Sequence, residues 1–108
     1  INNDNGAMNK KSSADVGASS GDYASLEQNA PNPFHQQTTI AYTTPENCQN
    51  SSLHIYNMNG AEIRSYAITQ KGKGSITVDA GSLKAGMYLY TLICDGREIA
   101  TKKMILTN

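Results

Sequence analysis

The sequence predicts an all-β fold, a small antiparallel sandwich, and three observations support this prediction. Short apolar or alternating segments recur from Leu26 to the end of the chain, turn-forming residues separate them, and no segment of useful length has helical periodicity. Short strands at such spacing are typical of a sandwich. Residues 1–23 differ, because their large apolar side chains are few and scattered. We therefore expect a flexible polar linker over residues 1–23 and one β domain over residues 24–108.

The domain is expected to begin with a stiff lead-in at residues 26–34 (LEQNAPNPF). Pro31 and Pro33 fix their own φ angles and favour extended backbone at the residue before each of them. Phe34 is then placed to insert into the core. Residues 32–35 add a strand to the sandwich if they pair along an edge.

The strands that follow are expected, in order, at residues 38–42 (TTIAY), 52–56 (SLHIY), 62–68 (EIRSYAI), 75–79 (SITVD), 86–94 (GMYLYTLIC) and 97–106 (REIATKKMIL). Residues 57–60 (NMNG) fit a type I turn with Gly60 at positive φ, and Asp95-Gly96 fits a two-residue type I′ hairpin. Residues 71–74 (KGKG) are predicted to form a loop, and Leu83 to be tucked inward from a turn. The count is six strands, or seven with residues 32–35.

The last hairpin predicts an irregularity in the final strand. A two-residue turn at Asp95-Gly96 would place Leu92 opposite Ile99, and the apolar face of the last strand would then switch near Lys102-Lys103. One extra residue reverses the alternation of a strand. We therefore predict a β-bulge at Lys102-Lys103.

Composition and charge exclude several classes of function. Lys and Arg number 9, as do Asp and Glu, so the net charge is zero and a nucleic-acid partner is not expected. No run of about 18 apolar residues is present, which argues against a membrane-spanning helix. A domain of this size has a thin core and no spare volume for a deep substrate cavity, so no small-molecule substrate is expected. The chain begins at Ile1, and we expect it to be a piece of a longer protein.

Residues that could do chemistry are few and dispersed. Cys48 and Cys94 permit a disulfide in an exported protein, but two free, half-buried thiols are the favoured interpretation. His35 and His54 do not form pairs with the spacing of metal ligands, so we expect no metal and no cofactor. There is no Gly-x-Ser-x-Gly motif, and the carboxylates are scattered along the chain. We expect no enzyme activity.

Two groups of side chains have alternative interpretations. Tyr56, Tyr66, Tyr88 and Tyr90 suit either a platform for carbohydrate or, more simply, positions in and around the core. Adjacent lysines in the last strand either discourage sheet-to-sheet aggregation, which is the favoured interpretation, or offer a positive handle to a receptor.

Taken in order along the chain, five segments resemble the type A C-terminal sorting domain of the type IX secretion system of Bacteroidetes. They are residues 26–34 (LEQNAPNPF), 38–42 (TTIAY), 53–60 (LHIYNMNG), 83–92 (LKAGMYLYTL) and 95–106 (DGREIATKKMIL). The resemblance covers about residues 26–108. Asn57 stands where the turn motif often has Asp, and both residues suit a turn. The positions that match the family's motifs are Pro31, Asn32, Pro33, Phe34, Tyr56, Asn57, Gly60, Gly86, Tyr88, Lys102 and Lys103.

The resemblance implies a seven-stranded immunoglobulin-like β-sandwich that acts as a sorting signal for an attached cargo protein. It implies recognition by an outer-membrane translocon and removal by a sortase-like peptidase. The cargo would pass through the periplasm and end at the cell surface or outside the cell. Such a domain would present a folded shape and strand edges, and we expect the first strand after Pro33 and the last strand to offer those edges.

Two other functions are weighed against sorting. One is a structural module, retained at the C-terminus of a mature Bacteroides-type surface or tail-fibre-like protein. The other is a carbohydrate-binding sandwich that uses the tyrosines.

Overall fold

The computed structural model describes residues 24–108, and the linker predicted over residues 1–23 lies outside the described residues. All regular elements from residue 24 onward are strands, and this part of the chain contains no helix that is long and apolar enough to cross a membrane. The seven strands are β1 (Ser25–Leu26), β2 (Gln37–Thr44), β3 (Ser51–Asn57), β4 (Glu62–Ile68), β5 (Gly72–Asp79), β6 (Gly86–Cys94) and β7 (Arg97–Leu106).

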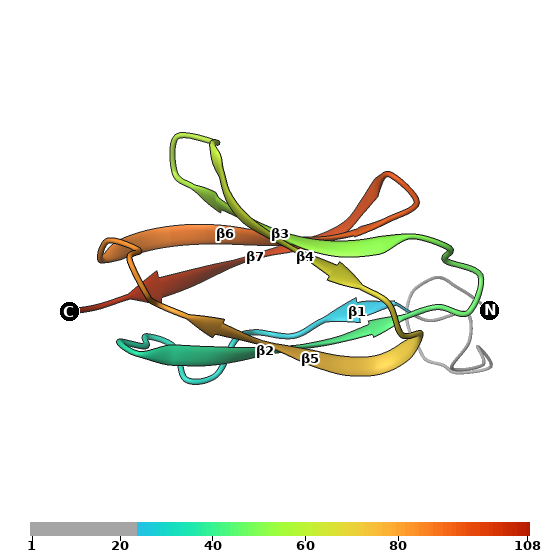
Figure 1. Cartoon of the computed structure of the whole chain (residues 1–108), viewed down its shortest axis with the longest axis horizontal. Coiled ribbons are helices and arrows are strands. Elements are labelled where there is room, and N and C mark those ends of the chain that lie inside the picture. Colours follow the sequence, from blue (N-terminus) through green and yellow to red (C-terminus); the bar gives the residue numbers. More distant parts are fainter. Residues whose placement is uncertain (1–23) are drawn as a thin grey trace, which may run out of the picture.

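The strands form two layers (Figure 1). One sheet has the order β1-β2-β5 and the other has the order β4-β3-β6-β7, and every pairing is antiparallel. The chain crosses between the sheets after β2, after β4 and after β5. Seven strands in two antiparallel layers, with crossovers of this kind, are the arrangement of an immunoglobulin-like sandwich. The predicted fold class is confirmed.

The core lies between the sheets, and alternation along each strand supplies it. Inward positions are apolar and outward positions are mostly polar, as expected for antiparallel sheets with one solvated face. Phe34 is only 2% exposed, so its predicted insertion into the core is confirmed, and Leu83 packs against the core from its turn. The side chains with least exposure come from both sheets: Ile40, Leu53, Ile55, Val78, Tyr90, Leu92 and Met104.

The six strands predicted over residues 38–106 all exist, and the bounds of β4, β6 and β7 are as expected. The predicted loop at residues 71–74 is wrong, because β5 begins at Gly72 and pairs with β2 along its whole length. The reason is tertiary: the ring of Tyr42 lies across Gly74, where an added Cβ would come within 2.5 Å of the Tyr42 hydroxyl. An aromatic side chain covering a glycine on the neighbouring edge strand stabilises the pairing.

The bulge in β7 exists, but its predicted position is wrong. Leu92 pairs with Ala100 and Ile93 pairs with Glu98, so Ile99 is the extra residue, close to the hairpin. The type I′ turn is as predicted, with Asp95 and Gly96 both at positive φ. With the bulge placed this early, every even-numbered residue from Ala100 onward faces the core side of the sheet.

The seventh strand is β1, not residues 32–35. Phe34 makes a single parallel bridge to Leu106 at the end of β7. The first strand after Pro33 was expected to be an edge, and this is also wrong, because β2 lies between β1 and β5. The edges of the two sheets are β1, β5, β4 and β7.

A buried tyrosine ties the lead-in to the second sheet. The Tyr90 hydroxyl donates to the carbonyl of Glu27 at 2.7 Å and accepts the N–H of Asn29 at 2.8 Å. The ring is fully buried, and burial raises the pKa of Tyr90 to about 12. Both backbone groups therefore depend on one neutral hydroxyl.

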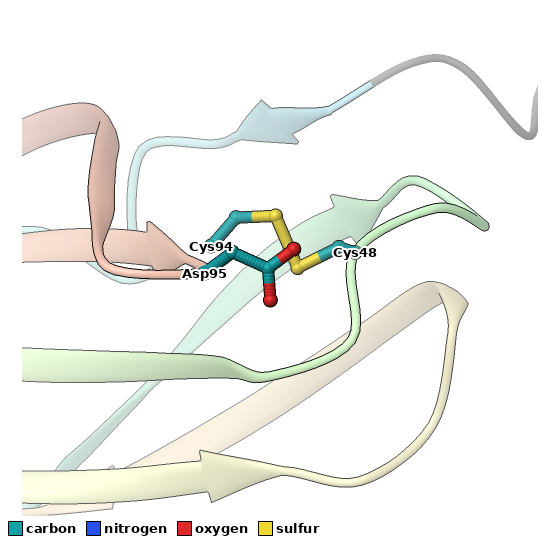
Figure 2. A group of neighbouring side chains, drawn as sticks. All are labelled: Cys48, Cys94 and Asp95. Atoms are coloured by element: carbon teal, nitrogen blue, oxygen red, sulfur yellow. A yellow bond between two sulfur atoms is a disulfide. The ribbon is translucent and has the colours of Figure 1, made fainter.

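A disulfide closes the end of the sandwich at which β3 begins and β6 ends (Figure 2). Cys48, in the loop between β2 and β3, is bonded to Cys94 at the end of β6, with 5.8 Å between the Cα atoms. The favoured interpretation of two free thiols is therefore wrong. No local pattern in the sequence could reveal this contact, since the cysteines are 46 positions apart. Closing a loop of that length stabilises a fold by roughly 4 kcal/mol in the chain-entropy description.

Asp95 holds the same loop through its carboxylate. The carboxylate accepts the N–H of Asn50 at 2.8 Å and the N–H of Gln49 at 3.1 Å. The hydrogen bond from Asn50 has the largest effect, and together with the one from Gln49 it lowers the pKa of Asp95 below its ordinary value of 3.8. The positive charge of Lys71 lowers this pKa further. Hydrogen bonds to an ionised acceptor are stronger than those to a neutral one.

We expect the Tyr90→Phe variant to be less stable than the wild type by about 1–3 kcal/mol, because the buried N–H of Asn29 and the partly buried carbonyl of Glu27 both lose their partner. Urea unfolding measures the difference. The Tyr56→Phe variant, which removes a hydroxyl from the outer face of the same sheet, is the matched control and should change stability by less than about 0.5 kcal/mol. Equal midpoints for the two variants would show that the Tyr90 hydroxyl does not hold the lead-in.

The stability that Asp95 contributes should depend on pH in the acid range. Because its pKa is lowered in the folded state, this contribution is present above the unfolded-state pKa and is lost as the pH falls through the folded-state pKa. Between about pH 5 and about pH 3, the unfolding free energy of the wild type should fall more steeply than that of the Asp95→Asn variant. Asn tolerates the positive φ at this position. Parallel pH profiles for the two proteins would contradict the assignment.

Candidate recognition surface

The lead-in pairs with the outer side of β7 through main-chain groups. The Phe34 N–H donates to the carbonyl of Ile105 at 3.0 Å, and the Thr107 N–H donates to the carbonyl of Phe34 at 2.8 Å. The side chain of Asn32 takes part in the same ladder, since its Oδ1 accepts the Ile105 N–H at 2.9 Å. The Asn-Pro-Phe motif is therefore the neighbour of the last strand.

Pro31 and Pro33 are exposed on the outside of this lead-in. The carbonyl of Pro31 accepts the Thr38 hydroxyl at 2.8 Å and the amide of Asn29 at 3.1 Å. Asn29 and Thr38 are both buried, and each is satisfied by these contacts. The prolines thus shape the surface, and the polar residues beneath them fix it to β2.

Lys102 and Lys103 point to opposite faces of β7. Lys102 pairs with Tyr90 and is half-buried on the core side, whereas Lys103 pairs with Leu89 and is exposed on the outer side. The carbonyl of Lys103 accepts the side chain of Gln28 at 2.6 Å. The two charges do not form one handle, and an inward-facing lysine on an edge strand is a known device against edge-to-edge pairing.

The turn after β3 has the predicted form. Gly60 is at φ 89°, and its N–H donates to the carbonyl of Asn57 at 3.0 Å. The Oδ1 of Asn57 accepts the N–H groups of Asn59 and Ala61 at 2.9 and 3.0 Å. This turn forms one wall of a shallow, open hollow of about 320 Å³ on the outer face of the sheet, whose other walls are β6 and β7.

The last two motif residues begin β6. Gly86, at φ 151°, pairs with Leu106, and Tyr88 pairs with Met104 on one side and Asn57 on the other. Tyr88 is 7% exposed, and its hydroxyl donates to the carbonyl of Lys84 at 2.5 Å. It is a core residue whose hydroxyl fixes the turn before β6.

The motif residues therefore gather in the half of the molecule that contains the C-terminus, away from the disulfide (Figure 1). The lead-in, the start of β6 and the end of β7 are in direct contact, and the turn after β3 joins them through the pairing of Asn57 with Tyr88. Sequence reasoning missed Thr101 and Leu89, which share the hollow with that turn. Neither residue belongs to a motif, and only the correct register of β7 places Thr101 there.

A shared tyrosine platform is not present. Tyr88 and Tyr90 are buried between the sheets, and Tyr66 packs against the core. Tyr56 alone lies beside the hollow on the outer face. The proposed carbohydrate-binding arrangement is wrong, because the four rings do not share a face.

Sequence reasoning also missed a line of three polar side chains on the outer face of β3 and β4. The Nε2 atom of His54 lies 2.8 Å from the Ser52 hydroxyl, and its Nδ1 atom lies 2.8 Å from a carboxylate oxygen of Glu62. The alternation of Ser52 and His54 on one strand was the available signal. This is the connectivity of a nucleophilic triad, but such a site also needs N–H donors for an oxyanion. β3 pairs on both sides, so its ladders use the N–H groups around Ser52.

The disulfide end offers no metal site from its own sulfurs. Cys48, Cys94 and Asp95 have their ligand-type atoms within 4.8 Å of one another (Figure 2). The two sulfur atoms are bonded to each other, however, and a thiolate is the form of cysteine that binds a metal.

Comparisons with known proteins connect this chain to a family of secretion-system domains. The family model described as the secretion system C-terminal sorting domain matches residues 30–107. No curated protein gave a significant match. Among solved structures, the chain is similar to an immunoglobulin-like protein from Pseudomonas aeruginosa, with 11% identity and a TM-score of 0.45, over 66% of this chain and 71% of that chain. That likeness is too distant to bear on function.

The family match, by contrast, spans residues 30–34 of the lead-in and every strand from β2 to β7. Domains of this family are signals on a cargo protein for export to the cell surface or outside, and the family is not a catalytic one. Because the match covers most of the sequence, the chain belongs to the family of C-terminal sorting domains of the type IX secretion system.

Proposed function

We propose that this domain directs an attached cargo protein across the outer membrane through protein–protein recognition, with no bond chemistry of its own. The single observation that carries the proposal is the family match over residues 30–107, which coincides with one folded sandwich. The partners would be the outer-membrane translocon, which reads the folded domain, and a sortase-like peptidase, which removes it.

The distribution of the motif residues supports a division of labour among them. Phe34 and Tyr88 are buried, so they set the shape of the domain. Exposed positions, including Pro31, Pro33 and Lys103, are the ones that a partner would touch. Asn32 links the two groups, because its side chain is bound to β7 while its surroundings are open.

The disulfide supports a route through the periplasm. Disulfides form and persist in oxidising compartments, of which the bacterial periplasm is one. The Cys48–Cys94 bond joins the loop before β3 to the end of β6, and these two strands pair in the same sheet, with Ser51 opposite Cys94. We infer that this bond forms in the periplasm, before the translocon receives the domain.

A fusion of residues 1–108 to the C-terminus of a passive periplasmic reporter tests the proposal. In a bacterium that has a type IX apparatus, we expect most of the reporter on the surface or in the medium, and in a translocon-deletion strain we expect it in the periplasm. The same reporter without the domain is the control. Mass spectrometry of the exported reporter then reads its C-terminus.

Loss of the domain from the exported reporter is the expected result, because a sortase-like peptidase would cut upstream of the sandwich. An exported reporter that keeps Asn108 would instead support a retained structural module. A fusion that stays in the periplasm of the competent strain would refute the sorting proposal.

A further inference from the structure

Among residues 24–108, no strand pairs with the outer edge of β5. β5 is the last strand of the β1-β2-β5 sheet, and it pairs with β2 alone. On the other side of the sandwich the edges cover each other, because β1 lies against β7 and the lead-in bonds to β7. Two edges remain, β4 with 7 residues and β5 with 8. The edge of β5 is thus the longer of the two that have no neighbouring strand.

The main-chain groups of β5 turn alternately toward β2 and away from it, as in any antiparallel pair. Ala80, just after the strand, faces β2, because its N–H donates to the carbonyl of Gln36 at 2.8 Å. The odd-numbered residues therefore face away, and the carbonyl of Asp79 accordingly binds Arg64 on β4. The N–H and carbonyl groups of residues 73, 75 and 77 bind no other group within residues 24–108.

No feature of β5 closes this edge to a further strand. Natural edges are often protected by proline, by a bulge or by a charge that points inward. β5 contains no proline, and its register with β2 is continuous. Its single lysine, Lys73, lies near the start of the strand and is exposed, as are Ser75 and Thr77. Their main-chain groups are therefore accessible from the side.

The order of charges along β5 suits a second copy of the same strand. Lys73 is near the start, Asp79 is at the end, and the residues between them are uncharged. When two copies run antiparallel, the start of each strand meets the end of the other, so lysine approaches aspartate. Opposite charges across a strand pair are stabilising and like charges are destabilising. A partner strand with charges of one sign would instead meet a like charge at one end.

The unpaired groups also select the register. A two-fold axis at Ser75 places Ser75 opposite its own copy and Lys73 opposite Thr77 of the second copy, so all of these groups gain a partner. Lys73 is then diagonal to Asp79 of the second copy, within reach of a long side chain. A shift toward the strand end would need the carbonyl of Asp79, which Arg64 already binds. A shift toward the start would bring the two Lys73 side chains diagonal to each other.

We propose that the chain forms a two-fold symmetric dimer in which the β5 edges of two copies pair antiparallel about Ser75. The two three-stranded sheets then become one continuous sheet. β5 lies at the opposite edge of its sheet from β1, so the lead-in and the end of β7 stay accessible in the dimer. This inference goes beyond the proposed sorting function and does not depend on it.

Cysteine cross-linking of the purified, disulfide-oxidised chain tests the register. Opposed residues of a hydrogen-bonded antiparallel pair have Cα atoms about 5.5 Å apart, which suits a disulfide. Under mild oxidation, Ser75→Cys should therefore become mostly a covalent dimer on a non-reducing gel. Thr77→Cys, the matched control on the same face, should remain mostly uncoupled, because its two copies would be about 13 Å apart along the pair. Absence of the Ser75→Cys dimer, or equal coupling of the two variants, would overturn the proposal.

Sedimentation equilibrium measures the affinity and tests the charges. Lys73→Glu places a carboxylate near Asp79 of the second copy, whereas Lys103→Glu makes the same change of net charge on β7, beside β1. The dissociation constant of the Lys73→Glu dimer should be about tenfold that of the wild type, since the contact occurs twice. The Lys103→Glu value should lie within about twofold of the wild type.

The outcomes separate this inference from the proposed function. A wild-type chain that stays monomeric at about 1 mM would overturn the dimer and leave the sorting proposal untouched. Equal dissociation constants for Lys73→Glu and Lys103→Glu would also overturn the dimer. A reporter fusion that is not exported would refute sorting alone, because the dimer is measured on the purified chain.

Discussion

The lead-in strap, residues 26–34, is the constraint on which the rest of this structure depends. Two stacked sheets are held together mainly by apolar packing, which is not directional. Arg64 on β4 adds hydrogen bonds to the carbonyls of Asp79 and Ala80 at the end of β5. The strap adds directional bonds to both sheets: Ala30 exchanges two hydrogen bonds with Thr39 on β2, and Phe34 bonds to Ile105 on β7. Tyr90 holds the middle of the strap from inside the core. The strap therefore helps to fix the relative position of the two sheets by bonding to both of them.

This strap explains why family motifs that are distant in the sequence act as one unit. Asn32 and Ile105 are 73 residues apart, yet they share a hydrogen bond. A change in the Asn-Pro-Phe motif would displace the last strand, and removal of the last residues would expose Phe34 and leave the strap without a partner. Met104 and Leu106 belong to the core as well, so a truncation there removes fold and signal together. Substitutions of exposed side chains are needed to separate an effect on the fold from an effect on the sorting signal.

Strands and turns that depend on neighbouring residues could be predicted from the sequence. Pairings and bonds between residues far apart in the chain could not. Alternation and turn residues were sufficient for β4, β6 and β7, and for the positive φ angles at Gly60 and Asp95. The first residues of β5 were missed because their pairing depends on Tyr42, a residue of another strand. The bulge was predicted from the right conflict in the apolar pattern, but the pattern alone does not choose between Ile99 and the lysines. The disulfide and the strap contacts join residues far apart, and no local pattern encodes them.

In the candidate site, too, single motif residues could be predicted and contacts between distant residues could not. Motif residues were predictable one by one, but the contacts between the lead-in and β7 were not, because they join residues far apart in the sequence. Side-chain chemistry does not supply an alternative: Ser52, His54 and Glu62 line up on β3 and β4, but the backbone around them is already paired. In a sandwich whose central strands have paired N–H groups, main chain is available to a partner only at the edges. Under the proposed function, a partner would therefore meet this domain at a strand edge or on the outer surface of a sheet.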